Sequence, residues 1–186
     1  MKAQGTRADG SGEMTMSTDV SDEILEKLRA AVATFDPGGL GIDCWDRGGP
    51  PGQGYESDVL IVRPEVEVLL RTRFDRGYEP PFRVEEYTSV PDAAVRGQLA
   101  TLALQAFEQT FPEEQPVPMG GATKISLKVY VSPPPGEPVT AAPPEIVKTF
   151  FLKLPDALAG LGQLVRARTA ALMAGAPKIL SAPAPP

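Results

Sequence analysis

The stretch that decides the fold is residues 66–87, V-E-V-L-L-R-T-R-F-D-R-G-Y-E-P-P-F-R-V-E-E-Y. Apolar and charged residues alternate along its first arm, as in a strand with one buried side and one solvent-facing side. The predicted inward row is Val66, Val68, Leu70 and Phe74, and the predicted outward row is Glu67, Arg71 and Arg73. This arm is therefore predicted to be a strand with one side packed against the hydrophobic core.

A turn follows at residues 75–77, where glycine ends a three-residue connection, and the alternation resumes beyond it. We therefore predict a β-hairpin. Pro80 and Pro81 lack the N–H donor that a central strand needs, which places the return arm at a sheet edge. The outward side chains of this arm are the first candidates for binding a partner: Arg83, Glu85 and Tyr87.

Apolar residues recur at helical spacing in three further segments, and branched residues alternate in two others. The predicted helices cover residues 21–35, 89–111 and 154–174, and the second predicted strand pair covers residues 124–131 and 146–154. A short extra strand is predicted near Cys44. The order α-β-β-α-β-β-α predicts a two-layer α+β domain, with a mostly antiparallel sheet of four to five strands and three helices packed on it.

Proline and glycine mark the parts outside this domain, because they favour turns, stiff loops and extended tails. We predict a disordered tail at residues 1–17, a single domain at 18–175 and a Pro/Ala-rich tail at 176–186. Within the domain, residues 36–57 form a Gly/Pro-rich loop and residues 132–145 a proline-rich finger. The P-x-x-P spacing in the finger makes Pro135 and Pro138 candidate partner-binding residues.

The net charge of −6 argues against nucleic acid as a partner, because phosphate binding needs clustered Lys and Arg. No apolar run reaches the length of a membrane span, so we expect no membrane partner and a cytoplasmic location. Tyr130 and the lysines of its strand are predicted to lie on a solvent-facing side of the sheet, which is either a surface that only keeps the protein soluble or a docking surface. Tyr130 is therefore a further candidate partner-binding residue.

Histidine is absent, which excludes catalytic triads and zinc sites built on imidazole. The single cysteine, Cys44, is interpreted as a small apolar filler. An oxygen-ligand site for Mg²⁺ stays open, with five candidate acidic residues: Asp43, Asp46, Asp58, Glu65 and Glu67. No lysine or histidine stands beside these acids as a nuclease strand would require, so we predict no cofactor.

The preferred hypothesis is a non-enzymatic protein-binding or assembly protein that binds a protein partner or itself, as a homo-oligomer or within a larger assembly. In element order, size and acidity, the chain is loosely similar to type III secretion chaperones and to phage-tail or contractile-injection adaptors. That resemblance implies a small acidic adaptor. Two alternatives remain: an immunity protein against a basic toxin, and a Mg²⁺-dependent phosphodiester hydrolase that uses the acidic residues.

Overall fold

The computed structural model of the chain describes residues 16–48, 55–74, 82–109, 124–132, 143–151 and 154–180. Within them lie one antiparallel sheet of seven strands and three α-helices. The strands are β1 (Leu40–Gly48), β2 (Tyr55–Val62), β3 (Glu67–Phe74), β4 (Phe82–Ser89), β5 (Lys124–Val131), β6 (Glu145–Phe151) and β7 (Lys178–Leu180). The helices are α1 (Met16–Thr34), α2 (Ala93–Glu108) and α3 (Ala159–Met173), the last preceded by the 3-10 turn η1 (Asp156–Leu158).

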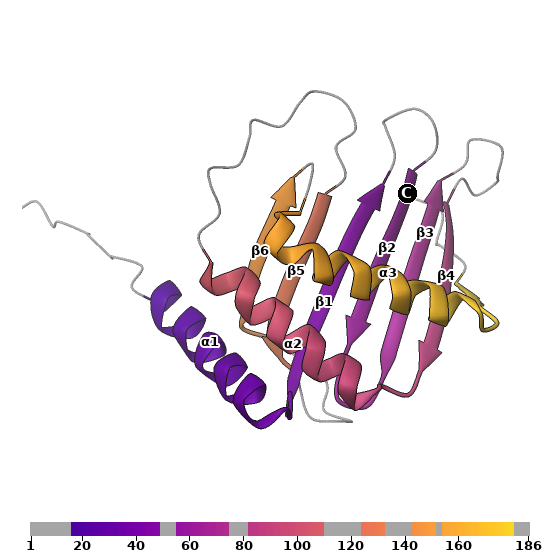
Figure 1. The fold of residues 1–186 in the computed structure, drawn as a ribbon. Helices are drawn as coiled ribbons and strands as arrows, with labels where there is room; N and C mark the ends of the chain where they lie inside the picture. The colour runs from indigo at the N-terminus through magenta and orange to yellow at the C-terminus, as the bar shows by residue number, and fades with distance from the viewer. Residues whose placement is uncertain are drawn as a thin grey trace, which may run out of the picture.

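The strand order across the sheet is β6-β5-β1-β2-β3-β4-β7 (Figure 1). Strands β1 to β4 form an antiparallel meander, which β5 and β6 extend beyond β1 and β7 extends beyond β4. The α+β class, the hairpin of β3 and β4, and the antiparallel pair of β5 and β6 are confirmed. The predicted number of four to five strands is wrong, and so is the predicted order α-β-β-α-β-β-α, because four strands separate α1 from α2 and one strand follows α3.

Two short-range features explain the missing strands. The N–H of Arg63 donates to the carbonyl of Val66 at 3.0 Å and closes a turn, so residues 55–62 form a strand of their own that pairs with β3. β7 has only three residues, too few for an alternation to be recognised, and it lies in the segment that we assigned to the C-terminal tail. Strand β1 also occupies much of the predicted loop at residues 36–57.

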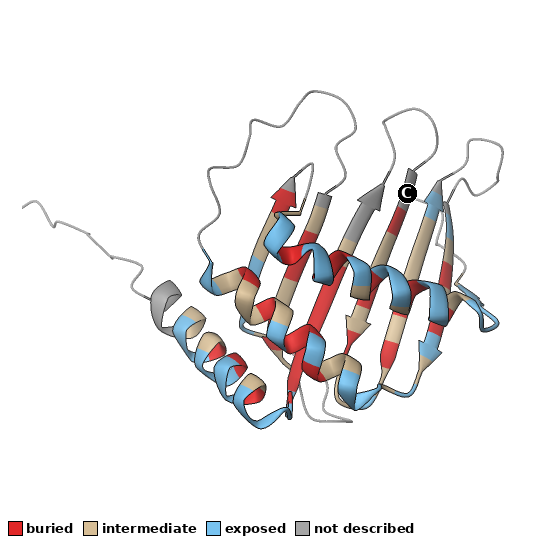
Figure 2. Ribbon diagram, viewed as in Figure 1, coloured by how far each residue is buried: buried red, intermediate tan, exposed pale blue. Residues whose placement is uncertain are grey.

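All three helices pack on one face of the sheet (Figure 1). Buried side chains from the strands meet the inner sides of α2 and α3 there, and Figure 2 shows this layer of buried residues between sheet and helices. The most deeply buried leucines of this core are Leu28, Leu60, Leu69, Leu99, Leu127, Leu158 and Leu161. None of the helices in the described ranges is long and apolar enough to cross a membrane.

Two predicted helix starts differ from the structure. α1 begins at Met16, inside the predicted disordered tail, whose residues 1–15 lie outside the described ranges. α2 begins after Asp92, whose carboxylate accepts the backbone N–H of Ala94 at 2.8 Å. Ser89 still belongs to β4 and cannot cap α2, because Pro91 keeps the preceding residue out of helical geometry.

The predicted inward row of β3 is wrong. Glu67 and Leu69 are both 0% exposed and point to the helices, whereas Val68 and Leu70 are half-buried on the opposite face. The alternation correctly grouped the residues that share a face, but it assumed that the charged row was the wet one. That assumption fails because the carboxylate of Glu67 has an arginine partner inside the molecule.

Candidate functional site

The face of the sheet opposite the helices, here called the open face, has an apolar centre. No helix or strand among the described residues packs on it (Figure 1). Val59 and Ile61 of β2 stand opposite Leu70 and Val68 of β3, and Val84 of β4 stands opposite Leu180 of β7. These half-buried residues form the apolar patch: Val59, Ile61, Val68, Leu70, Val84 and Leu180.

The patch has a simple origin in the sequence, because β2 and β3 contain apolar residues without alternation. Residues 59–62 read V-L-I-V and residues 68–70 read V-L-L, so side chains on both faces are apolar. Antiparallel strands that face water on one side normally alternate apolar and polar residues. A sheet face that breaks this rule over several neighbouring strands is a candidate interaction site.

The other half of the open face is mostly polar, apart from Trp45 and the exposed Val147, and is organised around Tyr130 of β5. Its ring lies over Gly41 of β1, where a Cβ atom would be 2.4 Å from the ring carbon Cζ. The hydroxyl of Tyr130 donates to Oδ1 of Asp43 at 3.0 Å and accepts from Nε of Arg63 at 3.0 Å. Burial, followed by the charge of Asp43, raises the pKa of Tyr130 to about 12.

Asp43 is a buried carboxyl group on this face. Burial raises the pKa of Asp43, while the hydrogen bond from Tyr130 and the charges of Lys128 and Arg63 oppose that rise. The carboxyl group of Asp43 is therefore stabilised by Tyr130 and Lys128 of the sheet and by Arg63, which follows β2. It needs no partner from a helix.

Lys128 of β5 connects this polar half with the edge strand. Its ammonium group lies 2.8 Å from a carboxylate oxygen of Glu145 in β6 and 5.2 Å from the centroid of the Trp45 ring. A lysine held by both a carboxylate and an aromatic ring is fixed more firmly than a free surface lysine. The polar half is thus a set of paired side chains beside the apolar patch.

The helix-covered face carries a different polar arrangement. Arg168 of α3 donates from Nε to Oε1 of Glu67 at 2.9 Å, and its Nη2 contacts Oε2 of the same carboxylate. Ser89 of β4 donates to Oε2 at 3.2 Å. The hydrogen bonds to Glu67 raise the pKa of Arg168. This fork-like ion pair fastens α3 to the sheet, so its role is structural.

The three candidate residues of β4 lie on the helix-covered face. Tyr87 is 8% exposed, and its hydroxyl donates to Oε2 of Glu85 at 2.9 Å, while Arg83 contacts Oε1 of Glu85 at 2.9 Å. β7 pairs with β4 from Val84 to Glu86. Glu85 and Tyr87 are buried, so the expectation that they point outward is wrong, as it was for Glu67 in β3, whereas Arg83 is exposed. The expectation that β4 is an edge is wrong because β7 pairs with it. Partner binding by these residues stays a prediction.

The remaining candidates fall into two groups. Tyr130 does lie on the open face, but at 4% exposure its ring is enclosed by its neighbours. Pro135 and Pro138 lie outside the described residues, as does most of the predicted proline-rich finger. Cys44 packs in the core as the predicted filler, and burial raises the pKa of its thiol.

Three of the five acidic residues predicted as a metal cluster have neighbours that keep them apart, and the side chain of Asp46 lies outside the described residues. Asp43 lies on the open face and Glu67 on the helix-covered face, where Arg168 neutralises it. Asp58 lies 3.4 Å from Nε of Arg71. Across the described ranges, no group of three acidic or sulfur side chains is placed to hold a metal ion.

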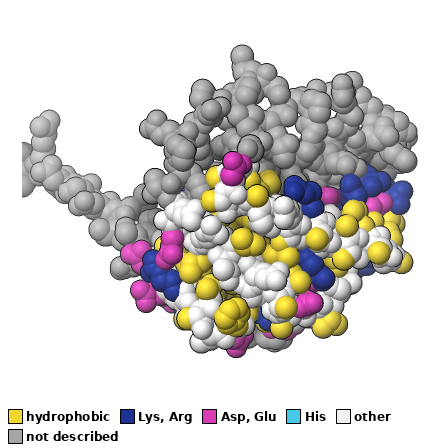
Figure 3. All heavy atoms as spheres, in the orientation of Figure 1, with side chains coloured by type: hydrophobic (Ala, Val, Ile, Leu, Met, Phe, Trp, Pro, Cys, Tyr) yellow, Lys and Arg dark blue, Asp and Glu magenta, His cyan; other side chains and the backbone are white. Residues whose placement is uncertain are grey.

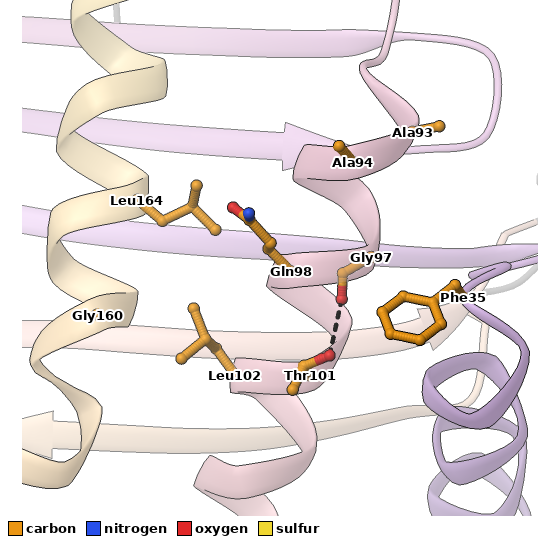
Figure 4. Close-up of a pocket in the computed structure, with 9 residues that line it drawn as sticks. All are labelled: Phe35, Ala93, Ala94, Gly97, Gln98, Thr101, Leu102, Gly160 and Leu164. Atoms are coloured by element: carbon orange, nitrogen blue, oxygen red, sulfur yellow. Dashed lines mark hydrogen bonds between the residues drawn. The ribbon is translucent and has the colours of Figure 1, made fainter.

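A second apolar surface lies on the helix side, where apolar side chains spread over the helices (Figure 3). A groove of about 660 Å³ runs there, lined by Phe35, Ala93, Ala94, Gly97, Gln98, Thr101, Leu102, Gly160 and Leu164 (Figure 4). Phe35, just beyond α1, is 80% exposed and has a φ of 52°, a backbone conformation that favours glycine. Its ring stands beside Gly97, at the end of the groove away from α3.

No protein-family model, curated protein or solved structure matches this chain.

Neither apolar surface was predicted from the sequence. The apolar patch had a readable signal, because runs such as residues 59–62 are apolar on both sides of a strand. The groove had none. It arises where small residues of α2 meet α3 and where Phe35 is left exposed, and both depend on how the helices pack.

Proposed function

We propose that the chain is a non-enzymatic protein-binding or assembly protein and that the open face is its binding surface. The observation that supports this most directly is the apolar patch on a sheet face that none of the described helices covers. Contiguous apolar surface on a folded domain commonly marks the place where a protein partner binds. The polar side chains around Tyr130 supply the surrounding rim, which is the usual composition of an interface.

The energetics require a partner that covers more than the patch. If a partner removed about 50 Å² of water contact from each of the six side chains, the gain would be roughly 7.5 kcal/mol at about 25 cal/mol per Å². Association itself costs about 4 to 15 kcal/mol in lost freedom. The patch alone therefore supports weak binding, and stable binding requires contacts with the polar half as well.

This role agrees with the functions that the sequence suggests. An adaptor of a secretion system or phage tail needs a surface for another protein, and so does an immunity protein. We place its action in the cytoplasm, and self-association is included among its possible binding modes.

Site-specific photo-crosslinking tests the proposal. A benzophenone amino acid replaces Leu70 on the open face, and in a control protein it replaces Glu26 on the exposed side of α1. After irradiation of the cells that normally make the protein, we expect a crosslinked product of discrete mass from position 70 and none from position 26. Equal products, or none from either position, would contradict the open face as a binding surface.

A further inference from the structure

We infer that the partner of the open face is a second copy of this chain, which stacks its own open face on the first. This inference rests on the proposed function and names the occupant of the same surface. Three observations lead to it: the balance of charge on the face, its area, and the way its apolar and polar halves are arranged.

The described charged side chains of the open face balance one another. Three are acidic, Asp43, Glu86 and Glu145, and three are basic, Arg63, Lys128 and Lys178. They are also engaged within the copy: Asp43 and Arg63 share the Tyr130 hydroxyl, and the other four form two ion pairs. The whole chain carries a net charge of −6. The open face is thus a neutral surface on an acidic protein, where a second copy meets no excess of like charge.

The area of the face agrees with a stable dimer. Strands of eight residues, such as β2, β3 and β4, are about 26 Å long. Six long strands spaced about 4.8 Å apart span roughly 29 Å, which gives a face on the order of 750 Å² per copy. A typical stable interface buries about 800 Å² on each partner. A partner that covered only one strand or one edge would leave most of the patch in water.

A twofold axis brings like surfaces together. If the axis lies between the two sheets and crosses the strands over β2 and β3, each copy places its apolar patch on the patch of the other. The polar halves then lie on one another at one side. Such an isologous arrangement is the commonest in homo-oligomers, and sheets stacked face to face pack about 10 Å apart.

Sedimentation equilibrium of the purified full chain is the first test. We expect the wild type to be a dimer at micromolar concentration. Leu70→Lys puts a charge at the centre of the proposed interface, and we expect its dissociation constant to rise about 100-fold or more, because a buried unpaired charge is costly. In a single copy the same lysine reaches water, so circular dichroism should show an unchanged fold. The matched control is Gln98→Lys in the helix-side groove, which we expect to remain a dimer.

Cysteine crosslinking gives an answer that does not depend on Leu70→Lys folding correctly. Cys44 is buried in the core and should not react in the folded protein, so a cysteine introduced at position 70 is the accessible thiol. We expect mild oxidation of Leu70→Cys to yield a disulfide-linked dimer. We expect Gln98→Cys to yield none.

The outcomes separate this inference from the proposed function. A wild type that is monomeric at all concentrations, or a dimer that Leu70→Lys leaves intact and Gln98→Lys dissociates, would overturn the second copy as partner. In that case, mass spectrometry of the crosslinked product from position 70 shows whether the proposed function still holds. Peptides of a different protein would leave the proposed function standing, and the absence of any product would end both.

Discussion

The two faces of the sheet satisfy a buried carboxylate in opposite ways. On the helix-covered face, Glu67 receives its positive partner, Arg168, from a helix that lies 101 residues further along the chain. On the open face, Asp43 is held by the hydroxyl of Tyr130, a residue of the neighbouring strand β5. The carboxylate on the first face therefore depends on a helix for its positive partner. The carboxylate on the open face is satisfied by residues of the sheet and by Arg63, which follows β2.

This difference explains how an apolar sheet face remains available. A carboxylate that needed a helix would require that helix to cover the open face as well. Because Tyr130 and its neighbours satisfy Asp43 locally, the polar half is stable without a helix over it, and none of the described helices covers the apolar patch beside it.

The largest expected effect is on the helix-covered face. Arg168→Ala leaves the carboxylate of Glu67 buried without its positive partner, and we expect a loss of about 3 to 5 kcal/mol in the free energy of unfolding. Urea denaturation measures it. The control is Arg166→Ala, an exposed position on the same helix, where we expect a change of no more than about 0.5 kcal/mol. Similar losses in both variants would show that the Glu67 pair does not fasten α3.

Two neighbouring leucines of β3 test the assignment of the faces. Leu69→Ala opens a cavity in the core and should cost about 2 to 5 kcal/mol. Leu70→Ala trims a half-buried side chain on the open face and should cost less than about 1 kcal/mol in dilute protein. Chemical denaturation of both variants at the same low concentration gives the comparison. The reverse order would mean that the predicted inward row was correct after all.

Alanine substitutions at two glycines of the same segment test the packing of Tyr130 in the polar half of the open face. Gly41→Ala places a methyl group against the ring of Tyr130, so the ring must move and both of its hydrogen bonds are disturbed. We expect a loss of about 1 to 3 kcal/mol in thermal unfolding. Gly39→Ala, where no atom lies within 4 Å of the added Cβ, should change little. A loss confined to Gly39→Ala would be incompatible with the described packing of Tyr130.

The smallest effect is expected at alkaline pH. The pKa of Tyr130 is raised from 10.0 in the unfolded chain to about 12 in the folded protein, so the unfolded chain loses its proton first. Stability is therefore full below pH 10 and falls as the pH rises through 12, with a loss of about 1.4 kcal/mol at pH 11. Denaturation curves at pH 8 and 11 measure this loss. Tyr130→Phe should lack this contribution; an unchanged difference between the two pH values would assign the loss to other groups.

Much of this architecture was predictable because it depends on local patterns. Helical spacing located all three helices, and alternation located the strands of both predicted pairs, since these signals come from neighbouring residues. The choice of the buried face of β3 was not predictable in this way. It depends on whether Glu67 meets Arg168, and only the folded chain brings these two residues together.

The candidate site was predictable only in part for the same reason. Tyr130 was singled out as an aromatic residue on a wet face, but its position over Gly41 depends on the pairing of β5 with β1. The edge assigned to β4 failed because β7 pairs with it from the far end of the chain. Contacts between distant segments therefore decided which surfaces are accessible.

The strand order also has a consequence for how the chain folds. Strands β1 to β4 pair with their neighbours in sequence, whereas β5 joins β1, and β7 joins β4, over separations of about 90 residues. We expect the four-stranded meander to form early and the two outer additions to follow slowly, because closing long loops costs entropy before the contacts form. During synthesis, the edge of β4 stays unpaired until residues 178–180 have left the ribosome. A chain that ended before Lys178 would keep that edge open and would be prone to aggregate.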